Sequence, residues 1–304
     1  MISIYYRTIK NERLQRVEGI RVGSWVDVVD PSEKDIRYLN RLGLSLTQLE
    51  DALDPDELPR IEKEGDVVYI ILNAPYQKQG RVLIAPFLIA IAPDIFVTFS
   101  REHLECIDRL LKEKEFYTTQ KTKNLFYLCL KIAESYEREI RKINKNIYTK
   151  KVHLSKLTNK DVVSLVELEE ILNKFITSLV SLIGIFEKIL SGKYVEIFEE
   201  DQELTEDLII DSRQSLDMCK TSIKNIVNIR EAYSTVLTNE LNKTIKFLTS
   251  LTLIIGVPTL IASFYGMNVA LPVQTNPLAY FYILLFIIFT SFILVLIFYL
   301  KKWL

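Results

Sequence analysis

No Asp, Glu, Lys or Arg occurs between Phe247 and Leu300, and this absence limits the possible folds more than any other feature of the chain. The stretch holds two apolar runs, 247–267 and 278–300, each close to the roughly 20 residues that a helix needs to cross a bilayer. The residues between the runs, 268–277, are uncharged and include proline, which predicts a tight turn. We therefore expect two transmembrane helices joined by a short turn.

The charged residues flanking these runs predict the orientation in the membrane. Lys243 and Lys246 precede the first run, Lys301 and Lys302 follow the second, and the turn has no charge. By the positive-inside rule, both termini lie in the cytoplasm and the turn lies outside. The first residues lack the apolar core of a signal peptide, so we expect a multi-pass plasma-membrane protein whose soluble part stays in the cytoplasm. A small acidic excess before residue 247 argues against a nucleic-acid partner.

Residues 1–118 alternate between strand and helix patterns and predict a cytoplasmic α/β domain with a mixed sheet. Its expected strands are 25–29, 67–72, 82–92 and 95–99, a helix begins within 31–35, and further helices cover 46–53 and 105–114. No phosphate-binding loop or catalytic constellation occurs, so we do not expect an enzyme. His103 and His153 lack ligand spacing, and Cys106, Cys129 and Cys219 read as reduced cytosolic thiols.

Two helical segments follow before the membrane. Residues 119–195 predict a coiled-coil hairpin with a break near His153–Asn159, in the form of a solvated helix pair. Residues 196–246 form the cytoplasmic part of a stalk helix, which opens on the acidic run 196–207. No proline or glycine interrupts the sequence from about Leu204 until Gly256 and Pro258. One helix of some 60 residues, about 95 Å long, is therefore expected to reach Met267.

A polar stripe follows one face of this helix. At alternating steps of three and four residues, the heptad register contains Asn242, Ile245, Thr249, Thr252, Gly256, Thr259, Ser263 and Gly266. A coiled coil places apolar residues on its seam, whereas a polar seam suits a bundle that is wide enough to hold water along its axis. Close packing of small residues between membrane helices is the alternative. It does not explain why the register remains polar below the membrane, although Lys224 in that register suits a cation path poorly.

One two-pass chain supplies a single lining helix, so a pore requires an oligomer. The second run, 278–300, is nearly uniform in Ile, Leu and Phe and fits an outer ring that faces lipid. A ring of Asn268 amides at the outer mouth would offer neutral oxygens to a hydrated cation. Ile245, Leu248 and Thr252 are candidates for a constriction.

The triplet Gly266-Met267-Asn268, preceded by Tyr265 and placed after the first of two C-terminal apolar runs, resembles that of the CorA-type magnesium channels. Asn242, Lys246, Leu248 and Thr249 and the C-terminal residues 301–304 fit the same pattern, most strongly over 239–304. The resemblance implies a funnel-shaped homopentamer. It also implies a selectivity mouth at Gly266, Met267 and Asn268 and a hydrophobic gate at Leu248. Unlike many relatives, the turn 269–277 carries no acidic residue, which predicts weaker capture of cations.

The resemblance also implies regulation by cytosolic Mg²⁺ bound between subunits. The acidic positions of the family map onto Asp207 and Glu231 in the stalk and onto Glu50 and Asp51 in the α/β domain. A divalent ion would bridge carboxylates that otherwise repel one another, and so hold the closed state. On this basis Mg²⁺ is both the transported and the regulatory ion.

Two alternatives remain at this stage. The chain could transport another divalent ion, such as Co²⁺, Ni²⁺ or Zn²⁺, although the stripe offers only hard oxygen ligands, which favour Mg²⁺. Co²⁺ and Ni²⁺ could also leak through a magnesium channel. The other alternative is a membrane-anchored coiled-coil scaffold or sensor that conducts nothing.

Overall fold

The computed structural model describes residues 1–10, 13–114, 116–154, 157–273 and 275–304. The chain divides into two compact units, Met1–Ile229 and Arg230–Leu304. A single helix, α6 (Glu199–Tyr265), contributes residues to both of them. The expected combination of an α/β domain, a long helix and a second apolar helix is present.

A seven-stranded mixed sheet forms the centre of the first unit, in the order β2-β1-β3-β7-β6-β5-β4. Strands β3 and β7 pair in parallel, and the other neighbours pair antiparallel. The strands are β1 (Ile2–Tyr6), β2 (Gln15–Arg16), β3 (Ser24–Val29), β4 (Arg60–Glu64), β5 (Val67–Lys78), β6 (Arg81–Ile91) and β7 (Ile95–Ser100). The sequence predicted β3, β5, β6 and β7 but missed β1, β2 and β4.

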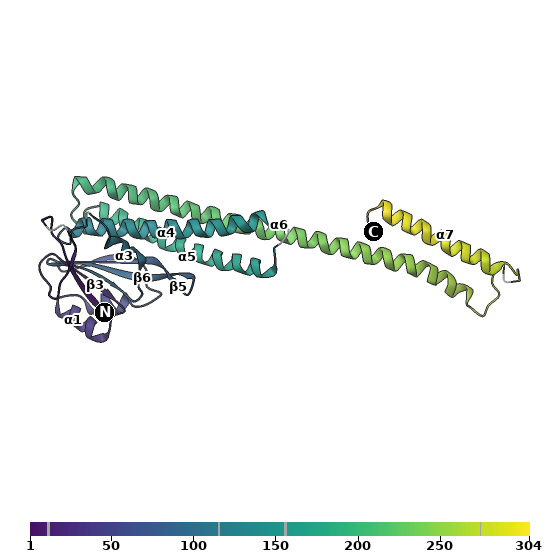
Figure 1. Cartoon of the computed structure of the whole chain (residues 1–304), viewed down its shortest axis with the longest axis horizontal. Helices are drawn as coiled ribbons and strands as arrows, with labels where there is room; N and C mark the ends of the chain where they lie inside the picture. The colour runs from purple at the N-terminus through teal and green to yellow at the C-terminus, as the bar shows by residue number, and fades with distance from the viewer. Residues whose placement is uncertain (11–12, 115, 155–156, 274) are drawn as a thin grey trace. The chain divides into compact units, whose positions relative to one another are not determined.

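Both faces of the sheet are buried, because helices cover each of them (Figure 1). Side chains alternate along a strand, so Tyr69 and Ile71 of β5 enter the core beneath α1 (Glu33–Arg41) and α2 (Leu46–Asp51). Their neighbours Ile70 and Leu72 enter the opposite core. The expected helix start in 31–35 is confirmed, since Ser32 and Asp35 form a capping box at the first turn of α1.

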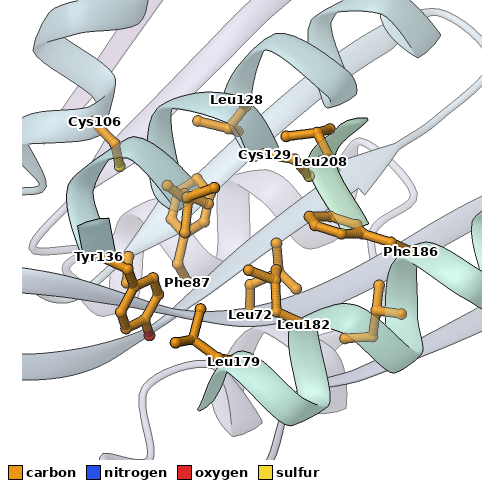
Figure 2. Close-up of a cluster of buried hydrophobic side chains, with 14 of the residues drawn as sticks. Leu72, Phe87, Cys106, Leu128, Cys129, Tyr136, Leu179, Leu182, Phe186 and Leu208 are labelled. Atoms are coloured by element: carbon orange, nitrogen blue, oxygen red, sulfur yellow. The ribbon is translucent and has the colours of Figure 1, made fainter. Parts of the chain in front are cut away.

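The opposite core joins the sheet to four helices. Figure 2 shows Leu72 and Phe87 of the sheet packed with side chains of α3 (Glu105–Leu110), α4 (Lys121–Val152), α5 (Asn159–Leu190) and α6. The two long helices of the predicted hairpin therefore share a core with the sheet and are not a free solvated pair. The break between them spans 153–158, of which residues 155 and 156 lie outside the described part.

The side of α6 that faces α4 and α5 is built mainly from small residues. Its buried positions include a set that recurs at steps of three and four: Thr205, Leu208, Ser212, Ser215, Cys219, Ser222, Ile226 and Ile229. We call this set the hydroxyl seam. Small side chains let helices approach closely but bury little apolar area, so this contact gains less from the hydrophobic effect than a leucine seam would.

In the second unit, α7 (Ala279–Leu300) runs back alongside the end of α6 (Figure 1). Its C-terminus is closed by a Schellman motif: Trp303 N–H donates to Phe298 O at 2.9 Å and Lys302 N–H donates to Tyr299 O at 3.0 Å. Lys302 takes the left-handed conformation, with φ of 56°. The rings of Trp303 and Phe298 stack with centroids 5.6 Å apart, which fixes the tail to the helix.

Candidate ion pathway and cation sites

The Gly266-Met267-Asn268 triplet lies in a turn just after α6. The helix ends at Tyr265, two residues before the expected Met267, and Gly266 N–H is shared between the carbonyls of Ala262 and Ser263 at 3.1 and 3.2 Å. All three residues of the triplet are exposed. A Cβ built on Gly266 would meet only ordinary contacts, the nearest at 3.5 Å, so this chain alone does not require glycine there.

The polar stripe of α6 is exposed along its whole length in the single chain. This holds for its polar and small members and for Ile245, which is 51% exposed; the neighbouring Leu248, outside the stripe, is 61% exposed. Asn242, Thr249, Thr252, Gly256, Thr259 and Ser263 complete the set. Nothing in the described part of this chain covers the stripe.

The opposite side of α6 faces α7. Ser250 is fully buried, and Ile254, Val257 and Ile261 are half-buried. At 100° per residue, these positions lie about 150° around the helix from the stripe. Small-residue packing between α6 and α7 of one chain therefore does not account for the stripe.

Threonines on the stripe present oxygen acceptors outward. The hydroxyl of Thr252 donates to Leu248 O at 2.9 Å, and that of Thr259 donates to Ile255 O at 2.8 Å. Because the hydroxyl proton is used within the helix, the remaining lone pairs can accept hydrogen bonds from water. Such a surface suits a cation that keeps its hydration shell.

The predicted regulatory residues lie on two different helices of the chain. Asp207 and Glu231 are exposed on α6, and Glu50 is exposed on α2. Asp51 ends α2 and is bound by Arg60, with Oδ2 2.6 Å from Nη2. Among the described residues, no three Asp, Glu, His or Cys side chains converge as a metal site. The described part of one chain thus does not bring the predicted regulatory residues together as a metal site.

The histidines show one contact that spacing did not predict. His103 Nε2 lies 3.3 Å from Asp108 Oδ1, and both side chains are about half-exposed or more. The three cysteines are buried and unpaired, and burial raises the pKa of Cys106 and of Cys219 to about 12. These thiols therefore stay protonated at neutral pH.

Sequence reasoning missed two polar clusters of the α/β domain. Asp27 is 8% exposed and accepts a hydrogen bond of 2.7 Å from Thr98, which in turn accepts one from Trp25 Nε1. Burial raises the pKa of Asp27 to about 6. The other cluster surrounds Arg60. The sequence signal for the Asp27 cluster was an acidic residue within the otherwise apolar run of β3.

Comparison with known proteins agrees with this layout. The family model for "CorA-like Mg2+ transporter protein" matches residues 22–302. The cobalt/magnesium transport protein CorA of Methanocaldococcus jannaschii is 26% identical over 291 residues, covering 92% of this chain and 90% of that protein. The complete structure of the CorA magnesium transporter from the same organism matches with a TM-score of 0.88 and 23% identity, over 100% of this chain and 99% of the other. The full-length CmaX protein matches with a TM-score of 0.77 and 16% identity, over 99% and 97% of the two chains.

In the part of the chain that the structure describes, two helices are long and apolar enough to cross a membrane: the apolar part of Asp201–Tyr265, and Ala279–Leu300. Their most apolar windows are almost entirely unburied within the chain. A core helix of a soluble protein would be covered, so this exposure favours the transmembrane interpretation.

Proposed function

The chain belongs to the family of CorA-like Mg²⁺ transporter proteins, and from this we propose that it is a Mg²⁺ channel that works as a homopentamer in the plasma membrane, with both termini in the cytoplasm. The observation that carries the proposal is the polar stripe of α6, which is exposed and faces away from α7. Copies of the chain that meet along this stripe would enclose a water-lined path.

Selection of the ion is assigned to the Gly266-Met267-Asn268 turn. One Asn268 amide from each copy would offer a ring of neutral oxygens to hydrated Mg²⁺. Such a ring attracts the ion without holding it, and an inside-negative potential of 100 mV gives a divalent ion about 4.6 kcal/mol of driving force. Co²⁺ and Ni²⁺, which are of similar size, are expected to pass more slowly. Leu248, with Ile245 and Thr252, would form the apolar constriction that closes the path.

The test is Mg²⁺ flux into proteoliposomes of the purified protein under an inside-negative potential. Asn268→Ala is expected to abolish flux while the oligomer still forms, because the mouth loses its amide ring. Thr275→Ala is the matched control, since it removes another exposed polar group from the same turn. Normal flux through Asn268→Ala would rule out the filter. No flux from well-assembled wild type at low internal Mg²⁺ would favour the scaffold or sensor function.

Regulation is assigned to cytosolic Mg²⁺ bound between Asp207 of one copy and Glu50 or Asp51 of the next, with Glu231 as a further acid on the stalk. Asp207→Ala should weaken closure by internal Mg²⁺, whereas Asp211→Ala, one turn further along α6 and also exposed, should not. Equal sensitivity of Asp207→Ala and wild type to internal Mg²⁺ would refute the assignment.

A further inference from the structure

A single guanidinium holds three carboxylates at the edge of the sheet. Arg60, the first residue of β4, donates from Nη2 to Asp51 Oδ2 at 2.6 Å and to Gln48 Oε1 at 3.2 Å. Its Nη1 donates to Glu57, and its Nε lies 3.2 Å from Glu62 Oε1. Arg60 therefore ties the end of α2 to the following loop and to β4.

The surrounding segment is strongly acidic, and Arg60 compensates only part of its charge. Between residues 50 and 66 the acidic residues are Glu50, Asp51, Asp54, Asp56, Glu57, Glu62, Glu64 and Asp66, and the basic residues are Arg60 and Lys63. Three of these acids pair with the same guanidinium, so each receives only a share of one positive charge.

Gln48 keeps the cluster in place. Gln48 is only 3% exposed. Its Nε2 donates to Glu62 Oε2 at 2.6 Å and to Glu64 Oε1 at 2.8 Å. Because a buried amide fixes both carboxylates, Glu62 stays beside Arg60 and Glu64 stays beside Glu62.

We propose that Arg60 sets the divalent-cation affinity of the Asp51 carboxylate by occupying it whenever no ion is bound. This inference rests on the proposed regulatory role of Glu50 and Asp51. A divalent ion that reaches Asp51 displaces one guanidinium N–H, while Arg60 keeps its bonds to Glu57 and Glu62. Because Mg²⁺ must displace the Arg60 guanidinium from Asp51, the apparent affinity for Mg²⁺ is lower. The Mg²⁺ concentration needed for closure is therefore higher.

The measurement is the Mg²⁺ concentration that gives half-maximal protection of the full-length detergent-solubilised protein from limited proteolysis. Arg60→Gln is expected to lower this midpoint about two- to fivefold, in line with the loss of one charge pair at a partly exposed site. Arg60→Lys retains the positive charge but loses the fork of N–H donors, so its midpoint should fall less than that of Arg60→Gln. A midpoint for Arg60→Gln at or above that of wild type overturns the proposal, as does an equal shift in both variants.

Variants that retain Arg60 give the opposite shift and do not depend on the stability of Arg60→Gln. Glu57→Gln removes a competitor for the guanidinium, so Arg60 should hold Asp51 more tightly and the midpoint should rise. Asp56→Asn removes one negative charge from the same segment without a contact to Arg60, and its shift should be smaller. Equal shifts for Glu57→Gln and Asp56→Asn would mean that general surface charge, not Arg60, sets the affinity.

Asp51→Asn separates this inference from the proposed function. If Asp51→Asn leaves the midpoint of wild type unchanged, the regulatory assignment of Asp51 is wrong and the inference about Arg60 falls with it. If Asp51→Asn changes the midpoint but Arg60→Gln and Glu57→Gln do not, the assignment stands and only the role of Arg60 is refuted.

Discussion

At the scale of single residues, the buried Asp27 makes the α/β domain sensitive to pH. Burial raises the pKa of this carboxyl from 3.8 to about 6, although Thr98 donates a hydrogen bond to it and His103 lies near enough to oppose the shift. Between these two pKa values the folded state holds the proton better than the unfolded chain does. Stability contributed by this group is therefore full below about pH 4 and lost as the pH rises through about 6.

Asp27→Asn should remove this dependence. Asn keeps an oxygen that can accept the Thr98 hydrogen bond but has no charge to bury. Near pH 7 we expect the variant to be more stable than wild type by up to about 3 kcal/mol, and we expect the difference to shrink toward pH 4. Apparent melting temperatures of both proteins in detergent across this range provide the test. A difference that does not vary with pH would show that Asp27 is not the titrating group.

At the scale of elements, the hydroxyl seam predicts two serine substitutions with opposite signs. Ser212 Oγ is buried and has no hydrogen-bond partner among the described residues, so Ser212→Ala should raise stability by about 1 kcal/mol. Ser222 bonds to Asn144 of α4 and to the carbonyl of Met218, so Ser222→Ala should lower stability by a similar amount. Thermal unfolding of the two variants side by side checks this, and shifts of equal sign would contradict the seam geometry.

At the scale of the whole molecule, the exposed stripe predicts contact between copies of α6. Thr249→Cys on the stripe should form disulfide-linked dimers readily under mild oxidation, because copies would meet there. Leu285→Cys, which is 69% exposed on α7, should form them less readily if α7 faces lipid. The three native thiols are buried and should not react, so the pattern can be read on a non-reducing gel. More dimer from Leu285→Cys than from Thr249→Cys would place the stripe outside the subunit contact.

Much of this molecule could be predicted from its sequence because its strongest signals are local. Two charge-free runs and an unbroken helical pattern were enough for α6 and α7, and neither Gly256 nor Pro258 ended α6. The β-branched runs were enough for β3 and β7. Strand β4 was missed because Arg60, Glu62, Lys63 and Glu64 give it the composition of a loop.

The features that were missed depend on contacts between distant parts of the chain. Asp27 and Thr98 meet only because β3 pairs with β7. Similarly, the predicted separation of the α/β domain from the helical hairpin ignored the shared core in which Phe87, Tyr136 and Phe186 lie together (Figure 2). Alternating and heptad patterns indicate that a face is buried but do not indicate what covers it.

The two edge strands of the sheet help to protect the chain from aggregation. One edge strand, β2, is only two residues long, and the other, β4, ends in the exposed charges of Glu62, Lys63 and Glu64. Short or charged edges resist the addition of a strand from another chain. During synthesis, neighbouring copies of the chain are thus kept from joining sheet to sheet.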